Sequence, residues 1–426
     1  MKLIVKKSRL SGTAVMPASK SHTIRAVAIA SLAKGVSKIH RPLISNDTLC
    51  AVNCYRMLGA DIETDDDTWT IKGTAGRIKP PDETIDVGNS GTTLRLAISS
   101  AALAELGAAI TFTGDEQIQS RPVGPLLNSL NDLGACAESL NNNGKPPVRI
   151  AGKLIGGQTS IECFTSQYLS SLLLASPLAL KDTTIDVPLL NEPGYVQMTL
   201  DWLDKQGVQY ENTGLRQFTI AGGQHYKSFK ETIAADFSSA TFFLCAAALC
   251  GEDVSILGLD FADSQPDKAV ADYLRQMGAD IQLNGRKVKI NAAPLKGVEI
   301  DMNQTPDALP AIAVTAAFAS GTTVLKNVPQ ARNKETDRIS CMTTELRKMG
   351  VEVEELPDGM IIKGTKPKAA RLAGHKDHRI VMALAVAAMA ADDCSLVDDA
   401  EAASVTFPNF TELMQAIGAS IELRPG

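Results

Sequence analysis

One short signature recurs six times along this chain of 426 residues and limits the folds that it can adopt. Each copy ends a helix-like stretch with a glycine, as in "MLGADI", "QMGADI" and "KMGVEV". The glycines are Gly59, Gly134, Gly207, Gly278, Gly350 and Gly418, with successive spacings of 75, 73, 71, 72 and 68 residues. Because glycine tolerates a positive φ, the signature predicts a helix that stops at the glycine and is followed by a strand. Spacing this even predicts a sixfold repeat.

Each repeat also opens alike, with a short polar segment before a largely apolar, alanine-rich stretch. These segments are "SKSHTIR" (19–25), "GNSGTTLR" (88–95), "FTSQYLS" (164–170), "DFSSATF" (236–242), "TPDALPA" (305–311) and "HKDHRIV" (375–381). The stretch that follows predicts a helix that is apolar on all sides and therefore buried. A second helix with one apolar face, as in "ISCMTTELRKMG" (339–350), leads to each glycine.

The repeat is thus a small α/β module of roughly 70 residues with one buried and one amphipathic helix. Six such modules suggest two domains of three modules each, with sheets packed around buried helices. We expect the chain to pass between the domains near "GGQHYKSFKE" (222–231).

The polar segments predict binding sites for anions. A helix begins with free N–H groups and a partial positive charge, which attract negatively charged groups. Several residues planted at these helix starts suit that role: Lys20, Ser21, Arg25, Asn89, Ser90, Gly91, Thr92, Thr165, Ser166, Gln167, His378 and Arg379.

Further charged candidates stand in the connecting segments, where each also has a plain structural interpretation. "QSRPVG" holds Arg121, and "RNKETDR" (332–338) places Lys334 and Arg338 one helical turn apart. Arginine suits bidentate contact with carboxylate or phosphate, yet the same segment could be an exposed, ion-paired helix start. Asp307 could act as an acid or base, or could simply cap a helix.

The overall composition narrows the class of protein. A net charge of -6 argues against a nucleic-acid protein, and eight cysteines without a C-x-x-C argue for reduced thiols in the cytoplasm. The longest apolar run, at 380–391, is too short to span a membrane. The H-x-x-H of "HKDHR" lacks an evident third ligand, so we expect no metal site.

Taken together, the motifs resemble those of the 5-enolpyruvylshikimate-3-phosphate synthase family of enolpyruvyl transferases. The resemblance covers essentially the whole chain: "PASKSHTIRA", "GNSGTTLRL", "RPVG", "TSQYLSSLLLA", "PDALPAIAV", "NKETDRI", "DHRIVMALAVA" and "TFPNF" occur in family order. It implies an α/β fold of two inside-out α/β barrels with three repeats each. The expected domains are 13–227 and 1–12 plus 228–426, with the active site in the cleft between them.

The resemblance also implies a reaction and its residues. Phosphoenolpyruvate and 3-phosphoshikimate would give 5-enolpyruvylshikimate 3-phosphate and phosphate, in a cytoplasmic monomer without metal, organic cofactor, nucleic acid or membrane. The implied catalytic residues are Asp307, Glu335 and Lys20. The implied ligands of 3-phosphoshikimate are Lys20, Ser21, Arg25, Thr165, Ser166, Gln167, Tyr195, Asp307 and Lys334. Those of phosphoenolpyruvate are Lys20, Asn89, Gly91, Arg121, Gln167, Arg338, His378 and Arg379.

Besides Thr165, which replaces a serine of the family's usual Ser-Ser pair and keeps the hydroxyl, the chain departs from the family pattern at four positions. Val405 stands where many members carry a lysine that contacts phosphoenolpyruvate, and Gln330 replaces an asparagine. Glu192, in "NEPGY", replaces a serine expected to contact 3-phosphoshikimate. Leu96 stands where proline is common, beside the helix start of Gly91, and we expect it to alter sensitivity to glyphosate, an inhibitor of the phosphoenolpyruvate site.

Three alternatives compete with this interpretation. One is a cyclase-like nucleic-acid enzyme built from similar modules, which the acidic charge balance and the few aromatic residues argue against. The sister transferase acting on UDP-N-acetylglucosamine would carry a reactive cysteine in the segment "GDEQIQSRPVG", which has none. A non-catalytic module that only binds a phosphorylated ligand would have no need of an acid and a base together, yet Lys20, Asp307 and Glu335 are all present.

Overall fold

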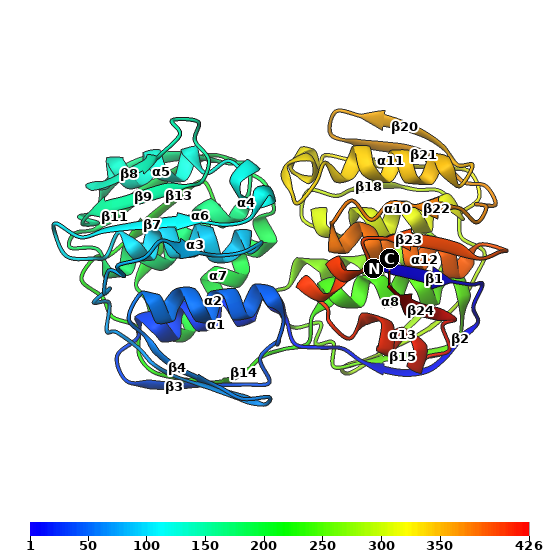
Figure 1. Cartoon of the computed structure of the whole chain (residues 1–426), viewed down its shortest axis with the longest axis horizontal. Coiled ribbons are helices and arrows are strands. Elements are labelled where there is room, and N and C mark those ends of the chain that lie inside the picture. The colour runs from blue at the N-terminus through cyan, green and yellow to red at the C-terminus, as the bar shows by residue number, and fades with distance from the viewer. Residues whose placement is uncertain (426) are drawn as a thin grey trace. The chain divides into compact units, whose positions relative to one another are not determined.

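The structure, a computed structural model, describes residues 1–425. It divides into two compact units (Figure 1), which we call the middle unit (Lys20–Ile233) and the terminal unit (Met1–Ser19 and the chain from Ala234 onward). The chain passes between them slightly later than the predicted 12/13 and 227/228. The reason is strand pairing: β2 (Leu10–Val15) joins β15 (Gly251–Leu257) of the terminal unit, and β14 (Lys230–Thr232) joins β3 (Val36–His40) of the middle unit.

The middle unit holds three four-stranded sheets with one common strand order, in which a parallel pair is followed by an antiparallel hairpin. The first sheet is β14, β3, β5 (Thr68–Lys72), β4 (Asp61–Thr64). The second is β6 (Ile85–Asp86), β7 (Ala109–Thr113), β9 (Val148–Gly152), β8 (Ala135–Ser139). The third is β10 (Gly157–Cys163), β11 (Thr183–Leu190), β13 (Gln217–Ile220), β12 (Tyr210–Thr213).

Three inner helices of the middle unit begin within the predicted polar segments. They are α1 (Lys20–Leu32), α3 (Gly91–Ala101) and α6 (Ser166–Ala175). Nearly every residue in them is buried, and α3 packs against both α1 and α6. The other helices are α2 (Asn46–Met57), α4 (Glu116–Ser120), α5 (Gly124–Asp132), the 3₁₀ turn η1 (Ser176–Leu178) and α7 (Pro193–Gln206).

The terminal unit repeats the same strand order in three more sheets. They are β16 (Asp280–Asn284), β17 (Lys287–Asn291), β15, β2; then β18 (Glu299–Asp301), β19 (Thr322–Lys326), β21 (Gly359–Lys363), β20 (Glu352–Leu356); then β22 (Arg371–Leu372), β23 (Ser395–Asp398), β1 (Lys2–Val5), β24 (Ile421–Arg424). The last sheet takes β1 from the start of the chain, so both described ends lie in one sheet.

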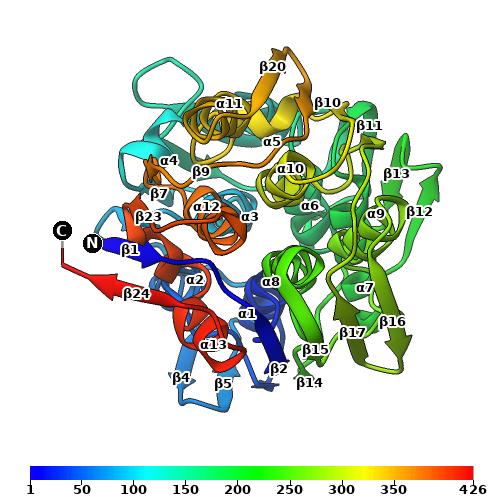
Figure 2. The ribbon, with the colours of Figure 1, turned by 90° about the vertical axis from the view of Figure 1, so that its right-hand side faces the viewer.

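Three inner helices form the centre of the terminal unit: α8 (Phe237–Cys250), α10 (Leu309–Ala317) and α12 (His378–Ala390). They contact one another, and Figure 2 shows them grouped with the sheets around them. Outside them lie α9 (Val270–Gln276), α11 (Arg338–Lys348), α13 (Phe410–Ala416) and the 3₁₀ turns η2 (Pro266–Ala269), η3 (Pro306–Ala308), η4 (Pro329–Asn333) and η5 (Ala400–Val405). One hydrophobic core joins these helices and strands. The predicted buried helices and α/β modules are confirmed.

The six signature glycines all have the left-handed backbone that the sequence predicted. Their φ angles are +105°, +96°, +70°, +101°, +82° and +95° for Gly59, Gly134, Gly207, Gly278, Gly350 and Gly418. Residues with a Cβ adopt this conformation at a cost of about 1 kcal/mol or more, which explains why the turn into the next strand takes glycine each time.

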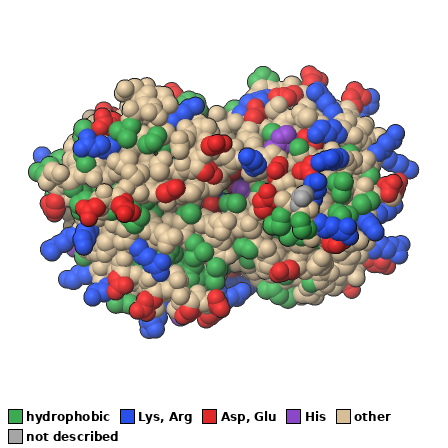
Figure 3. Space-filling view, in the orientation of Figure 1, with side chains coloured by type: hydrophobic (Ala, Val, Ile, Leu, Met, Phe, Trp, Pro, Cys, Tyr) green, Lys and Arg blue, Asp and Glu red, His purple; other side chains and the backbone are tan. Residues whose placement is uncertain are grey.

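The face of the molecule seen in Figure 3 carries interspersed charges of both signs. Exposed ion pairs such as Lys363 with Glu352, 3.1 Å apart, are of the kind that contribute little to stability. No helix within residues 1–425 combines the length and apolarity needed to cross a membrane.

We predict that Gly207→Ala lowers the free energy of unfolding by about 1 kcal/mol, through backbone strain alone. A Cβ at Gly207 would meet no atom within 4 Å, so packing is not disturbed. Denaturant unfolding measures the effect. Gly207→Asn is the control, because asparagine tolerates the left-handed region and should cost less; equal losses for both variants would contradict the explanation.

Candidate active site

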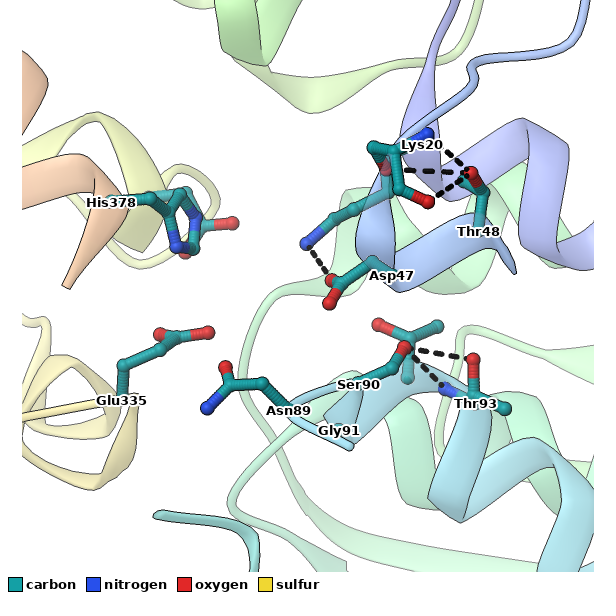
Figure 4. A network of polar contacts seen from close by, with 12 residues as sticks. Lys20, Asp47, Thr48, Asn89, Ser90, Gly91, Thr93, Glu335 and His378 are labelled. Carbon is teal, nitrogen blue, oxygen red and sulfur yellow. Dashed lines mark hydrogen bonds and ion pairs between the residues drawn. The ribbon is translucent and has the colours of Figure 1, made fainter. Parts of the chain in front are cut away.

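Lys20 begins α1 and is held by a residue that the sequence analysis did not single out. Its Nζ donates to Asp47 Oδ2 at 2.9 Å, as Figure 4 shows, and Asp47 is buried in the first turn of α2. The lysine side chain itself is only 15% exposed. A single ion pair therefore orients the ammonium group at the start of the inner helix. Asp47 follows the helix-start residues Ser45 and Asn46, which look like an ordinary cap in the sequence.

Arg25 of α1 is buried where it meets α6 and α7. Its guanidinium donates to the backbone oxygens of Ser21 at 3.1 Å and Tyr195 at 3.0 Å. It also donates to the hydroxyls of Thr199, at 2.9 Å, and Ser170, at 3.4 Å. Burial lowers the pKa of Arg25 to about 10. Arg25 therefore ties α1 to α6 and α7, and brings Ser21 and Tyr195 together.

The start of α3 is crowded by two guanidinium groups. A Cβ at Gly91 would lie 2.6 Å from Arg121 Nη1 and 2.9 Å from Arg95 Nη1, so a glycine lets both arginines approach the helix start. Arg95 also donates to Gln167 Oε1 at 2.7 Å, and so links α3 to α6. The sequence analysis missed Arg95. The signal was available, because Arg95 stands four residues after Gly91, as Arg25 stands four after Ser21.

The residues just before α3 are fixed by side-chain hydrogen bonds. Ser90 caps the helix and accepts from the Thr93 backbone N–H, which Figure 4 shows. The Asn89 amide donates to Asp115 Oδ2 and to Gln117 Oε1, both at 2.6 Å. The loop therefore presents its backbone to Arg121 in one defined conformation.

At the start of α6, the predicted hydroxyl pair is already engaged by a carboxylate. Thr165 is the cap of the helix, and its oxygen accepts from the Gln167 N–H. Glu192 Oε2 accepts from the Ser166 hydroxyl at 2.7 Å, from the Ser166 N–H at 3.1 Å and from the Thr165 hydroxyl at 3.2 Å. Gln167 donates its amide to Thr92 of α3 at 3.1 Å. The donors at the start of α6 therefore surround a buried acid, Glu192.

In the terminal unit, Asp307 lies between two arginines and caps no helix. Its Oδ1 accepts from Arg338 Nη1 at 2.7 Å, and its Oδ2 lies 2.9 Å from Arg379 Nη2. Burial acts to raise the pKa of Asp307, but the charges of Arg379, Lys334 and Arg338 outweigh it and hold that pKa well below its usual range. The capping interpretation is wrong, since Asp307 belongs to η3 and its side chain bonds to these arginines.

Arg338 is the centre of this charged cluster. It is fully buried and donates to Asp307, to Glu335 and to Asp377, with Nε 2.8 Å from Asp377 Oδ2. Burial alone would lower the pKa of Arg338, but the carboxylates of Asp377, Glu335 and Asp307 raise it. Asp377, which the sequence analysis did not assign, also caps α12 by accepting from the Arg379 N–H at 2.8 Å. The Asp377 carboxylate thus helps to position both Arg338 and Arg379.

The segment 332–338 is only partly what the sequence predicted. The turn η4 ends at Asn333 and α11 begins at Arg338, so the prediction of one helical turn between Lys334 and Arg338 is wrong. Asp337 caps α11 and pairs with Arg332 at 2.6 Å, as expected of an ion-paired helix start. Arg338 itself points inward and is buried. The ion-paired helix start therefore describes Arg332 and Asp337, and the binding-site interpretation can apply to Arg338.

A clamp of three side chains holds the chain just before α12. His375 Nε2 lies 2.8 Å from Glu345 Oε1, and Glu345 also accepts from Lys348 at 2.8 Å and from the Ala373 N–H at 3.0 Å. His375 has a positive φ of 53°. The clamp fixes the approach to His378, which is buried with its Nδ1 4.0 Å from Asp377.

The four departures from the family pattern fall in different surroundings. Val405 is half-buried at the end of η5, Leu96 is buried in α3, and Gln330 is buried and donates to the Asn303 carbonyl at 2.9 Å. Nothing in the structure explains what replaces a lysine at Val405. Glu192 is the one charged residue among the four, and its carboxylate contacts the predicted ligand-binding residues Thr165 and Ser166.

The architecture defines the class of the protein, which is that of the enolpyruvyl transferases. Solved structures with this fold include EPSP synthase from Acinetobacter baumannii, with a TM-score of 0.83, 26% identity and full coverage of both chains. The enolpyruvyl transferase NikO from Streptomyces tendae shares the fold with a TM-score of 0.79 at 18% identity, over 99% of this chain and 98% of that one.

Sequence comparison then identifies the family. The sequence model of the family EPSP synthase (3-phosphoshikimate 1-carboxyvinyltransferase) matches residues 4–414. A 3-phosphoshikimate 1-carboxyvinyltransferase from Acetivibrio thermocellus is 52% identical over 99% of both chains. One from Ruminiclostridium cellulolyticum is 48% identical over 99% of this chain and 100% of that one. The chain belongs to the EPSP synthase family.

We predict that Asp377→Asn lowers the free energy of unfolding by about 3 kcal/mol, because it breaks a fully buried ion pair and leaves Arg338 short of one carboxylate. Denaturant unfolding is the measurement. Glu352→Gln serves as the control, since it breaks an exposed pair and should cost less than about 1 kcal/mol. Equal costs for the two variants would show that the buried pair is not special.

We also predict that the clamp makes stability depend on pH. Contacts with the Cys341 thiol and the Glu345 carboxylate raise the pKa of His375 to about 10, from about 6.5 in the unfolded chain. The folded state therefore binds the proton more tightly, and this stabilisation is fully present below about pH 6.5 and lost as pH rises to about 10. His375→Asn should remove that part of the decline in stability between pH 7 and 10. An unchanged pH profile in the variant would contradict the prediction.

Proposed function

We propose that this chain transfers the enolpyruvyl group of phosphoenolpyruvate to the 5-hydroxyl of 3-phosphoshikimate, releasing phosphate and forming 5-enolpyruvylshikimate 3-phosphate. The observation that carries the proposal is Asp307 held between Arg338 and Arg379, with Glu335 on the same arginine. A base, a second acid and two guanidinium groups in one cluster are the equipment needed for proton transfers on an anionic substrate. The proposed site takes residues from both units.

The middle unit supplies most of the contacts to 3-phosphoshikimate in this proposal. Ligands from the middle unit are Lys20, Ser21, Arg25, Thr165, Ser166, Gln167 and Tyr195, and those from the terminal unit are Asp307 and Lys334. The convergence of Arg25 on Ser21 and Tyr195 supports this grouping, as do the hydroxyls at the start of α6. Helix starts with free N–H groups and hydroxyl side chains suit the phosphate of this substrate.

Phosphoenolpyruvate would be held by residues of both units. They are Lys20, Asn89, Gly91, Arg121 and Gln167 of the middle unit with Arg338, His378 and Arg379 of the terminal unit. Arginine binds carboxylate or phosphate through two parallel hydrogen bonds, which fixes orientation as well as charge. The crowding of Arg121 against Gly91 supports a tight fit of the ligand at the start of α3.

The reaction proceeds by addition and elimination. Asp307 takes the proton of the 5-hydroxyl while that oxygen attacks C2 of phosphoenolpyruvate, and Glu335 or Lys20 donates a proton to the methylene carbon, which becomes a methyl group. The tetrahedral intermediate then loses a methyl proton and phosphate, which restores the carbon–carbon double bond. Closure around the substrates excludes water from these steps.

Substrate binding itself would make Asp307 a better base. In the structure the pKa of Asp307 is held low by the charges of Arg379, Lys334 and Arg338 against the effect of burial. Anionic groups of phosphoenolpyruvate compete with Asp307 for two of these cations, Arg338 and Arg379. As those charges are neutralised by ligand, the pKa of Asp307 rises toward its usual range and the carboxylate can accept a proton.

The remaining assignments concern the setting of the enzyme. We place it in the cytoplasm as a monomer that acts on two small molecules, with no nucleic acid or membrane partner. The reduced state expected for its eight cysteines supports that compartment.

The decisive assay measures phosphate release by the purified protein from phosphoenolpyruvate, with 3-phosphoshikimate or UDP-N-acetylglucosamine as second substrate. We expect release only with 3-phosphoshikimate. Asp307→Asn should lower kcat by about 10²–10⁴-fold, the usual contribution of a general base, while 3-phosphoshikimate still binds.

Asp272→Asn, at an exposed ion pair of α9, is the matched control and should retain full activity. Release with the nucleotide sugar would instead make the protein a sister transferase. Binding of 3-phosphoshikimate without any release would make it a binding module.

A further inference from the structure

Glu192 is buried in a position that its own helix does not explain. It precedes α7, is 2% exposed and has the left-handed backbone angles φ 59° and ψ 47°. A glutamate adopts this conformation only where surrounding contacts hold it there. Although Glu192 stands at the cap position of α7, its side chain makes no capping bond to α7. The carboxylate reaches instead to the start of a different helix, α6.

At that helix start, a single oxygen of Glu192 takes three hydrogen bonds. Oε2 accepts from the hydroxyl and backbone N–H of Ser166 and from the hydroxyl of Thr165, at 2.7–3.2 Å. The partial positive charge at the start of α6 further favours an anion at this point. Three converging donors and a helix start are what a phosphate oxygen requires, and here a side chain of the protein fills the position.

We propose that Glu192 is an internal occupant of the phosphate subsite, which 3-phosphoshikimate must displace in order to bind. This inference rests on the proposed function, which assigns Thr165 and Ser166 to the 3-phosphate. A phosphate oxygen and Glu192 Oε2 cannot both occupy one set of donors. A carboxylate that remained beside a phosphate dianion would also repel it. Glu192 therefore leaves the donors when substrate binds, and it lowers the affinity for the phosphorylated ligand specifically.

Two variants distinguish the effect of the charge of Glu192 from the effect of its side-chain length. Glu192→Gln keeps the length and the acceptor oxygen but removes the charge. Glu192→Asn removes the charge and is too short to reach Ser166, while asparagine tolerates the left-handed backbone. Glu162→Gln is the matched control, because Glu162 is an exposed residue of the neighbouring strand β10.

The experiment titrates each full-length protein with 3-phosphoshikimate and with shikimate, which lacks the phosphate, by isothermal calorimetry. We expect Glu192→Asn to bind 3-phosphoshikimate about tenfold more tightly than the parent, a change of about 1.4 kcal/mol. Glu192→Gln should show a smaller gain, and affinity for shikimate should not change in either variant. Inorganic phosphate should compete more strongly in Glu192→Asn than in the parent.

Other results overturn the inference in distinguishable ways. Weaker or unchanged binding of 3-phosphoshikimate by both variants would show that Glu192 only braces the start of α6 against α7. Equal gains for shikimate and 3-phosphoshikimate would show a general loosening of the site. Ser166→Ala tests the underlying assignment: if it weakens binding while neither Glu192 variant tightens it, displacement fails and the proposed subsite stands. If the parent and all variants fail to bind 3-phosphoshikimate, the proposed function fails as well.

Discussion

The burial of six helices that are apolar on every side is the constraint on which the rest of this structure depends. Such a helix cannot lie on a surface, so each unit places three of them inside and surrounds them with sheets. Their flanks offer mainly packing contacts, with a few buried hydrogen bonds such as that between Ser171 and Ser99. Their polar starts are where most hydrogen-bonding and charged groups collect. Nearly every proposed ligand in the middle unit lies at or near such a start, and His378 and Arg379 begin α12.

The charged cluster of the terminal unit shows how such a site is made stable. Arg338 has no exposed surface, and a lone buried guanidinium would be very costly. Three carboxylates around it offset that cost. One of them, Asp307, is itself strongly paired with arginines and is therefore a weak base. A ligand that takes over the arginines restores the basicity of Asp307. In the middle unit the excess groups are hydrogen-bond donors instead. There the Glu192 carboxylate accepts from donors that an anionic ligand would use.

Sequence patterns found one member of most of these contacts and missed the partner. Lys20 and Arg338 stand out in the sequence, whereas the acids that hold them, Asp47 and Asp377, do not. In a sequence, a buried acid that forms an ion pair with a basic side chain cannot be told from an ordinary helix-capping residue. Its partner lies 27 residues away for Lys20 and 39 for Arg338, a separation that local periodicity does not reach.

The repeat, the buried helices and the glycine that ends each amphipathic helix could all be predicted from the sequence, because they depend on residue type and on spacing within one module. The sequence also placed the polar helix starts that carry the candidate site. Which of those side chains meet depends on tertiary packing. Asp307 and Arg379 come from different modules, and Glu192 reaches Thr165 and Ser166 from a separate element of the same module. These contacts follow from how elements of one module, or of two modules, pack together in space, and no local pattern encodes that arrangement.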